Sequence, residues 1–213
     1  MFRMTSFGAT IDNSINTGRG PYVFRVSGQI YHWIGNFCPE GDDTPRFLQL
    51  CIYDTDHELR NRLSHFESHE RQALRESVIQ GLIGFLNDNN ALVKLFRTAR
   101  DKLQEADIPN FSIRLFGVIR AHQYELPTAD SVGAIVYDGS PEAVTDYDVV
   151  IQRHSGEPES VNKLHPAYMA LPFPLLFIYG EEGYHLKLAL RNLDGNGHEE
   201  RKKMSMKENG TNR

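Results

Sequence analysis

The chain has 213 residues, 40% of them hydrophobic and 24% charged, which is enough apolar material for one folded domain and excludes wholesale disorder. The formal net charge of −5 excludes nucleic-acid binding driven by overall charge, so any such contact would have to be local. No run reaches the roughly 18 apolar residues that a membrane span needs, and the N-terminus lacks the apolar stretch of a signal peptide.

The first third of the chain predicts strands. Residues 1–19 form an N-terminal extension, after which we expect a single domain over residues 20–190. Tyr22–Val26 and Gln29–Ile34 are rich in β-branched and aromatic residues and flank a Ser-Gly pair, which predicts a β-hairpin. Arg46–Tyr53 alternates with apolar residues on both faces, which predicts a central strand that is covered on each side.

Helical periodicity dominates the next part. Asp54-Thr-Asp56 provides helix-capping and acidic first-turn residues. Two helices are expected before and after the break at Asn87–Asn90. Their predicted apolar stripes are Leu74, Val78, Leu82, Phe85 and Leu86 in the first, and Leu92, Leu95, Phe96, Ala99 and Leu103 in the second. We expect both helices to lay these stripes on the sheet.

The second half of the chain predicts the rest of the sheet and its core. Alternation in Phe111–Ile119 and two β-branched runs, Val132–Tyr137 and Asp148–Gln152, predict three strands. Leu164–Tyr179 is too apolar for a solvent-exposed loop and too rich in proline for one long helix, so we interpret it as a plug of the core. Residues 191–213 are almost wholly polar and predict a disordered tail.

Together these elements predict an α+β fold: a mostly antiparallel sheet, two to three helices packed on one face, and a disordered C-terminal tail. The only cysteines are Cys38 and Cys51, too few for a four-thiolate zinc site. Without a sign of secretion, we expect both to be reduced thiols in an intracellular protein.

Three histidines are the candidates for metal-dependent hydrolysis. His57 follows Asp54 at a helix start, His165 lies at the start of the predicted plug, and His185 closes the glycine-rich turn that follows it. A catalytic role requires that these side chains converge with carboxylates, and ordinary structural histidines are the alternative. The acidic residues Asp138, Glu142, Asp146 and Asp148 lack the ligand spacing of an EF-hand and are interpreted as solvated turn carboxylates. No cofactor or metal site is predicted.

One basic face is the candidate for nucleic-acid binding. Lys94, Arg97 and Arg100 recur at i, i+3 and i+6 on the second predicted helix, with Lys102 nearby and away from its apolar stripe. Such a face can contact a phosphate backbone, with an affinity that falls as salt rises. A solvated helix face that binds nothing is the alternative.

A series of short sequence segments resembles segments of the Helitron helicase-like proteins of plant rolling-circle transposons. In order, they are Met4-Thr-Ser-Phe-Gly8, Gly18-Arg-Gly-Pro-Tyr-Val-Phe-Arg25, Ser27-Gly-Gln-Ile-Tyr-His-Trp-Ile-Gly35, Pro45-Arg-Phe-Leu-Gln-Leu50, Ile52-Tyr-Asp-Thr-Asp56, Leu95-Phe-Arg-Thr-Ala-Arg-Asp101, Gly133-Ala-Ile-Val136, Thr145-Asp-Tyr-Asp148, Asn162-Lys-Leu-His-Pro-Ala-Tyr-Met169 and Pro174-Leu-Leu-Phe-Ile-Tyr-Gly180. The resemblance covers about residues 2–208.

The resemblance implies a segment that precedes the catalytic domains of a much longer replicase-helicase. That family carries a rolling-circle nuclease, with paired histidines and attacking tyrosines, and a DNA helicase. This chain has no His-x-His pair and no helicase phosphate loop, so no catalytic residue can be carried over. We therefore expect a non-catalytic fragment, nuclear if it functions as the family does, that positions single-stranded DNA or acts as a scaffold.

A protein-interaction module is the main alternative to that interpretation. It predicts an exposed apolar patch on the plug, His165–Tyr179, because large exposed apolar surfaces mark interaction sites. The hydrolase that uses His57, His165 or His185 is a third hypothesis.

Overall fold

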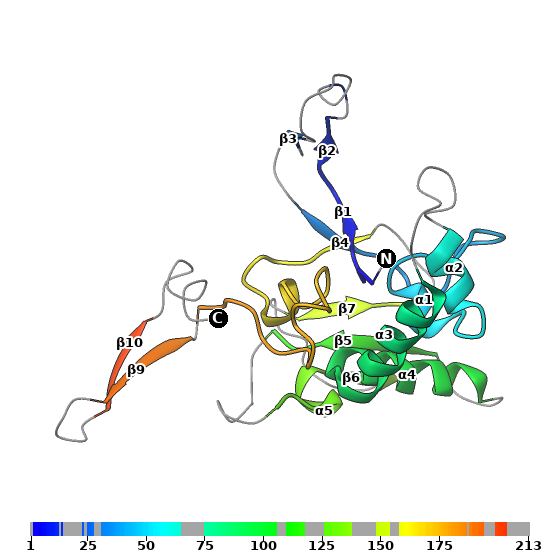
Figure 1. Cartoon of the computed structure of the whole chain (residues 1–213). Coiled ribbons are helices and arrows are strands. Elements are labelled where there is room, and N and C mark those ends of the chain that lie inside the picture. Colours follow the sequence, from blue (N-terminus) through cyan, green and yellow to red (C-terminus); the bar gives the residue numbers. More distant parts are fainter. Residues whose placement is uncertain are drawn as a thin grey trace.

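The structure is a computed structural model that describes residues 2–12, 14, 23, 25–27, 31–64, 75–105, 110–117, 126–137, 148–153, 158–186, 188–193 and 199–203. Within these ranges the chain forms five α-helices and two three-stranded antiparallel sheets, which confirms the predicted α+β class (Figure 1). None of the helices described there is both long and apolar enough to cross a membrane.

The helices are α1 (Gln49–Ile52), α2 (Glu58–Ser64), α3 (Glu76–Asn89), α4 (Ala91–Gln104) and α5 (Ala129–Val132), with a 3₁₀ turn, η2, at Pro166–Tyr168. The strands are β1 (Ser6–Phe7), β2 (Thr10–Ile11), β3 (Val26–Ser27), β4 (His32–Ile34), β5 (Phe111–Leu115), β6 (Gly133–Tyr137), β7 (Val149–Ile151), β8 (Glu159–Ser160), β9 (Ala189–Leu193) and β10 (Glu199–Lys203). One sheet has the order β6-β5-β7 and the other β1-β4-β8, while β2-β3 and β9-β10 are two-stranded pairs.

The β6-β5-β7 sheet confirms the three strands that alternation predicted. Ile113 in β5 lies opposite Ile135 in β6 and Ile151 in β7, and it is fully buried. β6 begins at a glycine because α4 crosses the strand there: a Cβ atom on Gly133 would lie 2.6 Å from Leu95 Cδ2 and 2.5 Å from the Arg114 carbonyl oxygen. Close packing of helix on strand therefore fixes this residue.

The helix α4 buries the stripe that its periodicity predicted, and it packs against α1, α5 and β6. In α3 the buried residues are Ile79, Ile83 and Leu86, whereas Val78 and Phe85 are 52% and 43% exposed. The predicted stripe is therefore confirmed at Leu86, is half-buried at Leu82 and is wrong at Val78 and Phe85, because apolar residues occupy two overlapping stripes of this helix. Leu74 lies outside the described residues. α3 packs mainly on α2 and α4 rather than on the sheet.

The predicted strand over Arg46–Tyr53 was wrong, because the segment turns into the short helix α1. Phe47 has a positive φ of 51°, and three successive i-to-i+3 backbone hydrogen bonds begin at the carbonyl groups of residues 46–48. Leu48, Leu50, Cys51 and Ile52 are all buried on this single turn. A short apolar segment that is buried all round has no period that distinguishes a strand from a helical turn.

The predicted hairpin over residues 22–34 was also wrong in its pairing. Val26–Ser27 pairs with Thr10–Ile11, and His32–Ile34 pairs with Ser6–Phe7 and Glu159–Ser160. Ser27, expected in the turn, thus lies in a strand. The N-terminal extension supplies the partner strands, so residues 2–12 belong to the fold.

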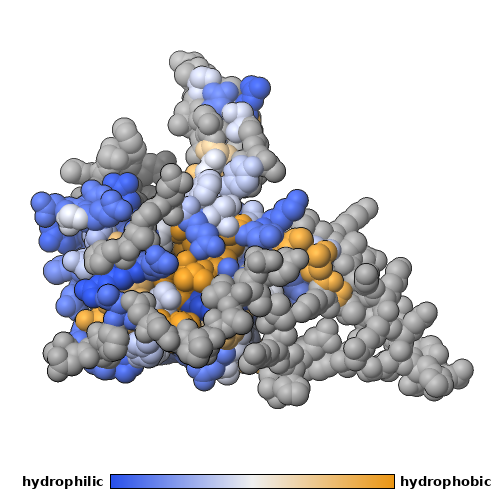
Figure 2. Space-filling model, turned by 180° about the vertical axis from the view of Figure 1, so that it is seen from behind, coloured by the Kyte–Doolittle hydropathy of each residue, from blue (hydrophilic) through white to orange (hydrophobic). Residues whose placement is uncertain are grey.

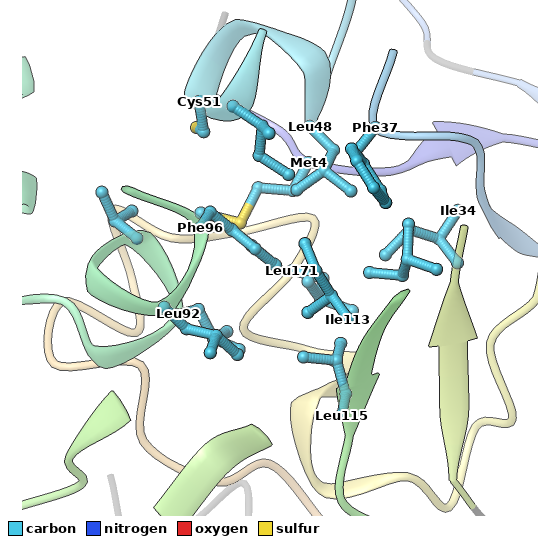
Figure 3. Packing of buried hydrophobic residues seen from close by; sticks show 14 of the residues in the cluster. Met4, Ile34, Phe37, Leu48, Cys51, Leu92, Phe96, Ile113, Leu115 and Leu171 are labelled. Atoms are coloured by element: carbon cyan, nitrogen blue, oxygen red, sulfur yellow. The ribbon is translucent and has the colours of Figure 1, made fainter. Parts of the chain in front are cut away.

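Leu164–Tyr179 forms the predicted plug, and hydrogen bonds from three residues of the N-terminus and the start of α4 hold it. The Met4 N–H donates to the Leu171 carbonyl at 2.9 Å, the Ala91 N–H donates to the Tyr179 carbonyl at 3.0 Å, and the Asn90 amide donates to the Phe177 carbonyl at 2.9 Å. Leu171 lies among the buried side chains of the core (Figure 3).

Part of the predicted tail is paired. β9 and β10 form an antiparallel hairpin that extends away from the body of the molecule (Figure 1). Residues 194–198 and 204–213 lie outside the described residues. Cys38 and Cys51 are both buried free thiols, as expected. The pKa of each is raised, mainly because burial disfavours the thiolate.

Candidate functional site

The structure divides the predicted basic face of α4. Arg100 pairs with Asp101 at 2.6 Å and Lys102 with Glu105 at 2.9 Å, and the hydrogen bond that Lys102 donates to Glu105 raises the pKa of Lys102. Lys94 is exposed. Arg97 instead turns toward α2, where its side chain is only 12% exposed. The four cations therefore do not form one continuous face.

Arg97 belongs to a buried ionic cluster, which we define as Glu58, Arg62 and Arg97. The Glu58 carboxylate accepts hydrogen bonds from Arg62 Nη2 at 2.6 Å and Arg62 Nε at 2.9 Å through Oε1, and from Arg97 Nη2 at 2.5 Å through Oε2. Glu58 and Arg62 are 5% and 3% exposed at their side chains. One carboxylate thus neutralises one of two buried guanidinium groups and hydrogen-bonds to both.

The remaining donors of the ionic cluster connect other elements. Arg97 Nη1 donates to the Cys51 carbonyl of α1 at 2.9 Å, and Arg97 Nε donates to Asn87 Oδ1 of α3 at 3.0 Å. The Arg62 guanidinium lies 4.6 Å from the centre of the Phe2 ring, within cation–π range. The cluster therefore ties the N-terminus and the first four helices together, which is a structural role.

Sequence reasoning missed this cluster, although one signal was present. Glu58 and Arg62 stand at i and i+4, the spacing of helical ion pairs. Nothing in that spacing indicated burial, which depends on the packing of α1 and α3 against α2 and on the contact from Arg97 of α4.

The three candidate histidines have separate partners. His57 is exposed, and its Nδ1 lies 3.0 Å from Asp54 Oδ1 at the start of α2. His185 is buried, and its Nε2 lies 3.1 Å from Glu182 Oε2. Over the described part of the chain, no group of three His, Cys, Asp or Glu side chains could hold a metal ion. The convergence that the hydrolase hypothesis requires is not seen among these residues.

His165 is held as a neutral imidazole inside the core. Its Nδ1 accepts the Ala167 N–H at 3.1 Å and thereby caps η2, and its Nε2 lies 3.4 Å from the Leu115 carbonyl, to which it can donate. Burial lowers the pKa of His165 to about 4, against smaller raising effects of the Leu115 hydrogen bond and the charge of Asp148. The ring is a structural connection between the plug and β5.

This environment predicts acid lability. The folded pKa of about 4 lies below the ordinary 6.5, so the unfolded chain binds a proton that the folded chain excludes. The stability gained by keeping His165 neutral is fully present above pH 6.5 and is lost as the pH falls toward 4. The expected loss in the free energy of unfolding is on the order of 3 kcal/mol. Denaturant titrations from pH 7.5 to 4 measure this. His165→Asn, which keeps an acceptor for the Ala167 N–H, should flatten the slope, whereas His57→Asn should not.

The interpretation of the acidic residues as solvated turn carboxylates is wrong for Asp148, the member of the four that the structure describes. Asp138, Glu142 and Asp146 lie outside the described residues. Asp148 is not a solvated carboxylate: it is 9% exposed, its Oδ2 accepts two hydrogen bonds from Arg114 at 2.6 and 2.9 Å, and its Oδ1 accepts the Gly117 N–H at 2.8 Å. This buried pair holds β7 against β5.

An exposed apolar surface lies on the plug, as the interaction-module hypothesis requires. Phe173, Leu175 and Leu176 are 37%, 41% and 73% exposed, and we call them the plug surface. The Leu176 and Phe177 N–H groups donate to the Phe173 carbonyl at 2.9 and 3.1 Å, so a hydrogen-bonded turn presents these side chains. Orange areas of apolar surface are visible on the otherwise largely hydrophilic rear face of the body (Figure 2).

A buried polar group lies next to the plug surface. The Phe173 ring is 6.4 Å from the ring of His32, which also contacts Tyr168 edge-on at 4.9 Å. His32 is 6% exposed, and its Nδ1 has no hydrogen-bond partner among the described residues. Burial, and then the charge of Arg3, lower the pKa of His32, so its ring is an aromatic packing surface rather than a charge.

Comparisons of the chain with models of protein families, with curated proteins and with solved structures gave no match.

Proposed function

We propose that this chain is a non-catalytic scaffold domain of the kind that a Helitron replicase-helicase carries ahead of its nuclease, and that it binds a neighbouring protein domain through the plug surface. The order of the short sequence segments supports the proposed family, and the plug surface is the observation that supports the proposed mode of action. In this role the domain would act in the nucleus.

The plug surface suits docking because its backbone is fixed before any partner arrives. Hydrogen bonds from Met4, Asn90 and Ala91 anchor the plug to the N-terminus and to α4. Side chains presented by a rigid backbone lose little further entropy on binding, so more of the apolar burial appears as affinity. Leu176, at 73% exposed, has the most surface to bury.

Single-stranded DNA has weaker support as the partner. Arg97 is engaged by Glu58, and the half-buried Arg100 and Lys102 each pair with a nearby carboxylate. Counterion release from phosphate contacts needs several unneutralised cations, and the chain as a whole has a net charge of −5. The hydrolase hypothesis has no converging residues to support it among those described.

The proposal is tested with the rolling-circle nuclease domain of a complete Helitron replicase, expressed separately and titrated calorimetrically into this chain. We expect binding, and a loss of about 30-fold in affinity for Leu176→Asp, the effect of removing an interface hot spot of about 2 kcal/mol. Leu126→Asp is the matched control, since Leu126 is a similarly exposed leucine (65%) outside the plug. Failure of the unmodified chain to bind, or equal effects of the two substitutions, would contradict the proposal.

A further inference from the structure

Two adjoining cavities form a groove on the side of the molecule where β4 ends. The first, of about 280 Å³, is lined by Trp33, Glu40, Asp43, Arg46 and Phe47 among others, and two buried core residues, Met4 and Leu48, also line it. The second, of about 320 Å³, lies along β7 and β8 and is lined by Val150, Gln152 and Glu159 among others. Gly35 and Asn36 line both cavities, so the two adjoin at these residues.

The wall of the first cavity is held in place at the cost of backbone strain. Gln49 Nε2 donates to the carbonyl groups of Asn36 and Cys38 at 3.2 and 3.3 Å, and its Oε1 accepts the Arg46 N–H at 3.0 Å. Next to this bridge, Phe47 adopts a φ of 51°, which is uncommon for a bulky residue, and it remains 38% exposed. Strained residues at the edge of a cavity are frequent in binding sites.

The lining selects for positive charge. Two aromatic rings, Trp33 and Phe47, stand with two carboxylates, Glu40 and Asp43, around one cavity, and Glu159 adds a third carboxylate in the next. Among the described lining residues Arg46 is the cation, and Arg153 lies close by, where it hydrogen-bonds the Cys38 side chain. Aromatic faces and carboxylates both attract a lysine or arginine side chain, whereas the same lining repels phosphate.

The second cavity follows the edge of a strand. The Val150 N–H of β7 donates to Glu159 Oε2 at 3.2 Å. If a further strand paired with β7, one of its carbonyl groups would accept this N–H, so the Glu159 carboxylate takes the place of that carbonyl group. Partial burial raises the pKa of Glu159, and the hydrogen bond from Val150 partly offsets this effect. A cation brought alongside would favour the ionised carboxylate.

We propose that this groove binds an extended, basic peptide segment of a partner protein. A lysine or arginine side chain enters the first cavity between Trp33 and Phe47, above Glu40 and Asp43. The peptide backbone crosses Gly35 and continues along β7. This site is separate from the plug surface, so the groove does not depend on the proposed function.

A larger side chain at Gly35 is expected to block the groove without disturbing the fold. A Cβ atom at Gly35 would meet nothing within 4 Å, and its φ is outside the left-handed region, so a larger residue projects into the groove without displacing the protein. Gly81 on α3 also has open space around its would-be Cβ. Gly35→Leu is therefore the blocking variant and Gly81→Leu the matched control, with thermal melts to show that both are folded.

Trp33 is the only tryptophan of the chain and lines the first cavity, so its fluorescence reports occupancy directly. The probe is an unstructured octapeptide of glycine and serine with two central arginines, and the comparison peptide carries two glutamates. We expect saturable quenching by the arginine peptide only. Gly35→Leu should weaken binding by at least about tenfold, and Gly81→Leu should leave it unchanged.

A double variant that removes the charges of Glu40 and Asp43 tests whether these carboxylates recognise the basic peptide. Glu40→Gln with Asp43→Asn should weaken binding of the arginine peptide by roughly 3- to 30-fold and reduce its salt dependence. The proposal is overturned if the unmodified chain does not bind the arginine peptide, if folded Gly35→Leu binds it as well as the control does, or if the glutamate peptide or oligo-dT competes equally.

Discussion

Replacing Glu58 with alanine is expected to lower the free energy of unfolding by about 3–5 kcal/mol. The substitution leaves Arg62 and Arg97 without their shared carboxylate, at sites where the two side chains are only 3% and 12% exposed. A buried guanidinium without a counter-charge retains its desolvation penalty and loses its Coulombic compensation. Urea denaturation followed by circular dichroism measures the change.

Arg100→Ala is the control on α4, because Arg100 pairs with an exposed neighbour, Asp101, and surface pairs contribute within about 0.5 kcal/mol. Combining Glu58→Ala with Arg97→Met should cost less than the sum of the single substitutions, since the uncompensated charge of Arg97 is removed with the carboxylate. A Glu58→Ala variant as stable as Arg100→Ala would show that the ionic cluster does not hold the helices together.

Asp148→Ala is expected to have a comparable effect, about 3–5 kcal/mol, because it breaks a second buried ion pair. Arg114 lies in the central strand β5, where its Nε and Nη2 groups donate to Asp148 Oδ2, while Asp148 Oδ1 accepts the Gly117 N–H. The substitution therefore leaves a buried charge and a backbone donor without this acceptor. Thermal and urea melts at pH 7 measure the loss.

The matched control is Asp130→Ala, which removes an exposed carboxylate near the same sheet and should change stability by no more than about 0.5 kcal/mol. The loss of stability for Asp148→Asn should lie between those for Asp148→Ala and Asp130→Ala. The amide oxygen can still accept a hydrogen bond, but the countercharge to Arg114 is lost. Equal melts for Asp148→Ala and Asp130→Ala would contradict a structural role for the buried pair.

The candidate sites show where sequence reasoning worked and where it failed. The plug was expected because Leu164–Tyr179 is too apolar for a solvent-exposed loop and too rich in proline for one long helix. Its exposed apolar surface was expected only under the interaction-module alternative. Arg97 and Asp148 were interpreted as solvated charges and are instead buried in ion pairs. Their partners, Glu58 and Arg114, are 39 and 34 residues away in the chain, so no local pattern could join them.

Local patterns were sufficient for the α+β class, for strands β5, β6 and β7, for the buried face of α4 and for the plug, because each depends on a period or a composition within a single segment. Only the tertiary structure decided that residues 46–53 form a turn of helix, that the N-terminal strands pair with β3 and β4, and that Trp33 lines a cavity. Short segments carry too few residues to show a period, and the pairing of strands, the burial of charges and the shape of a groove depend on contacts between residues distant in the chain.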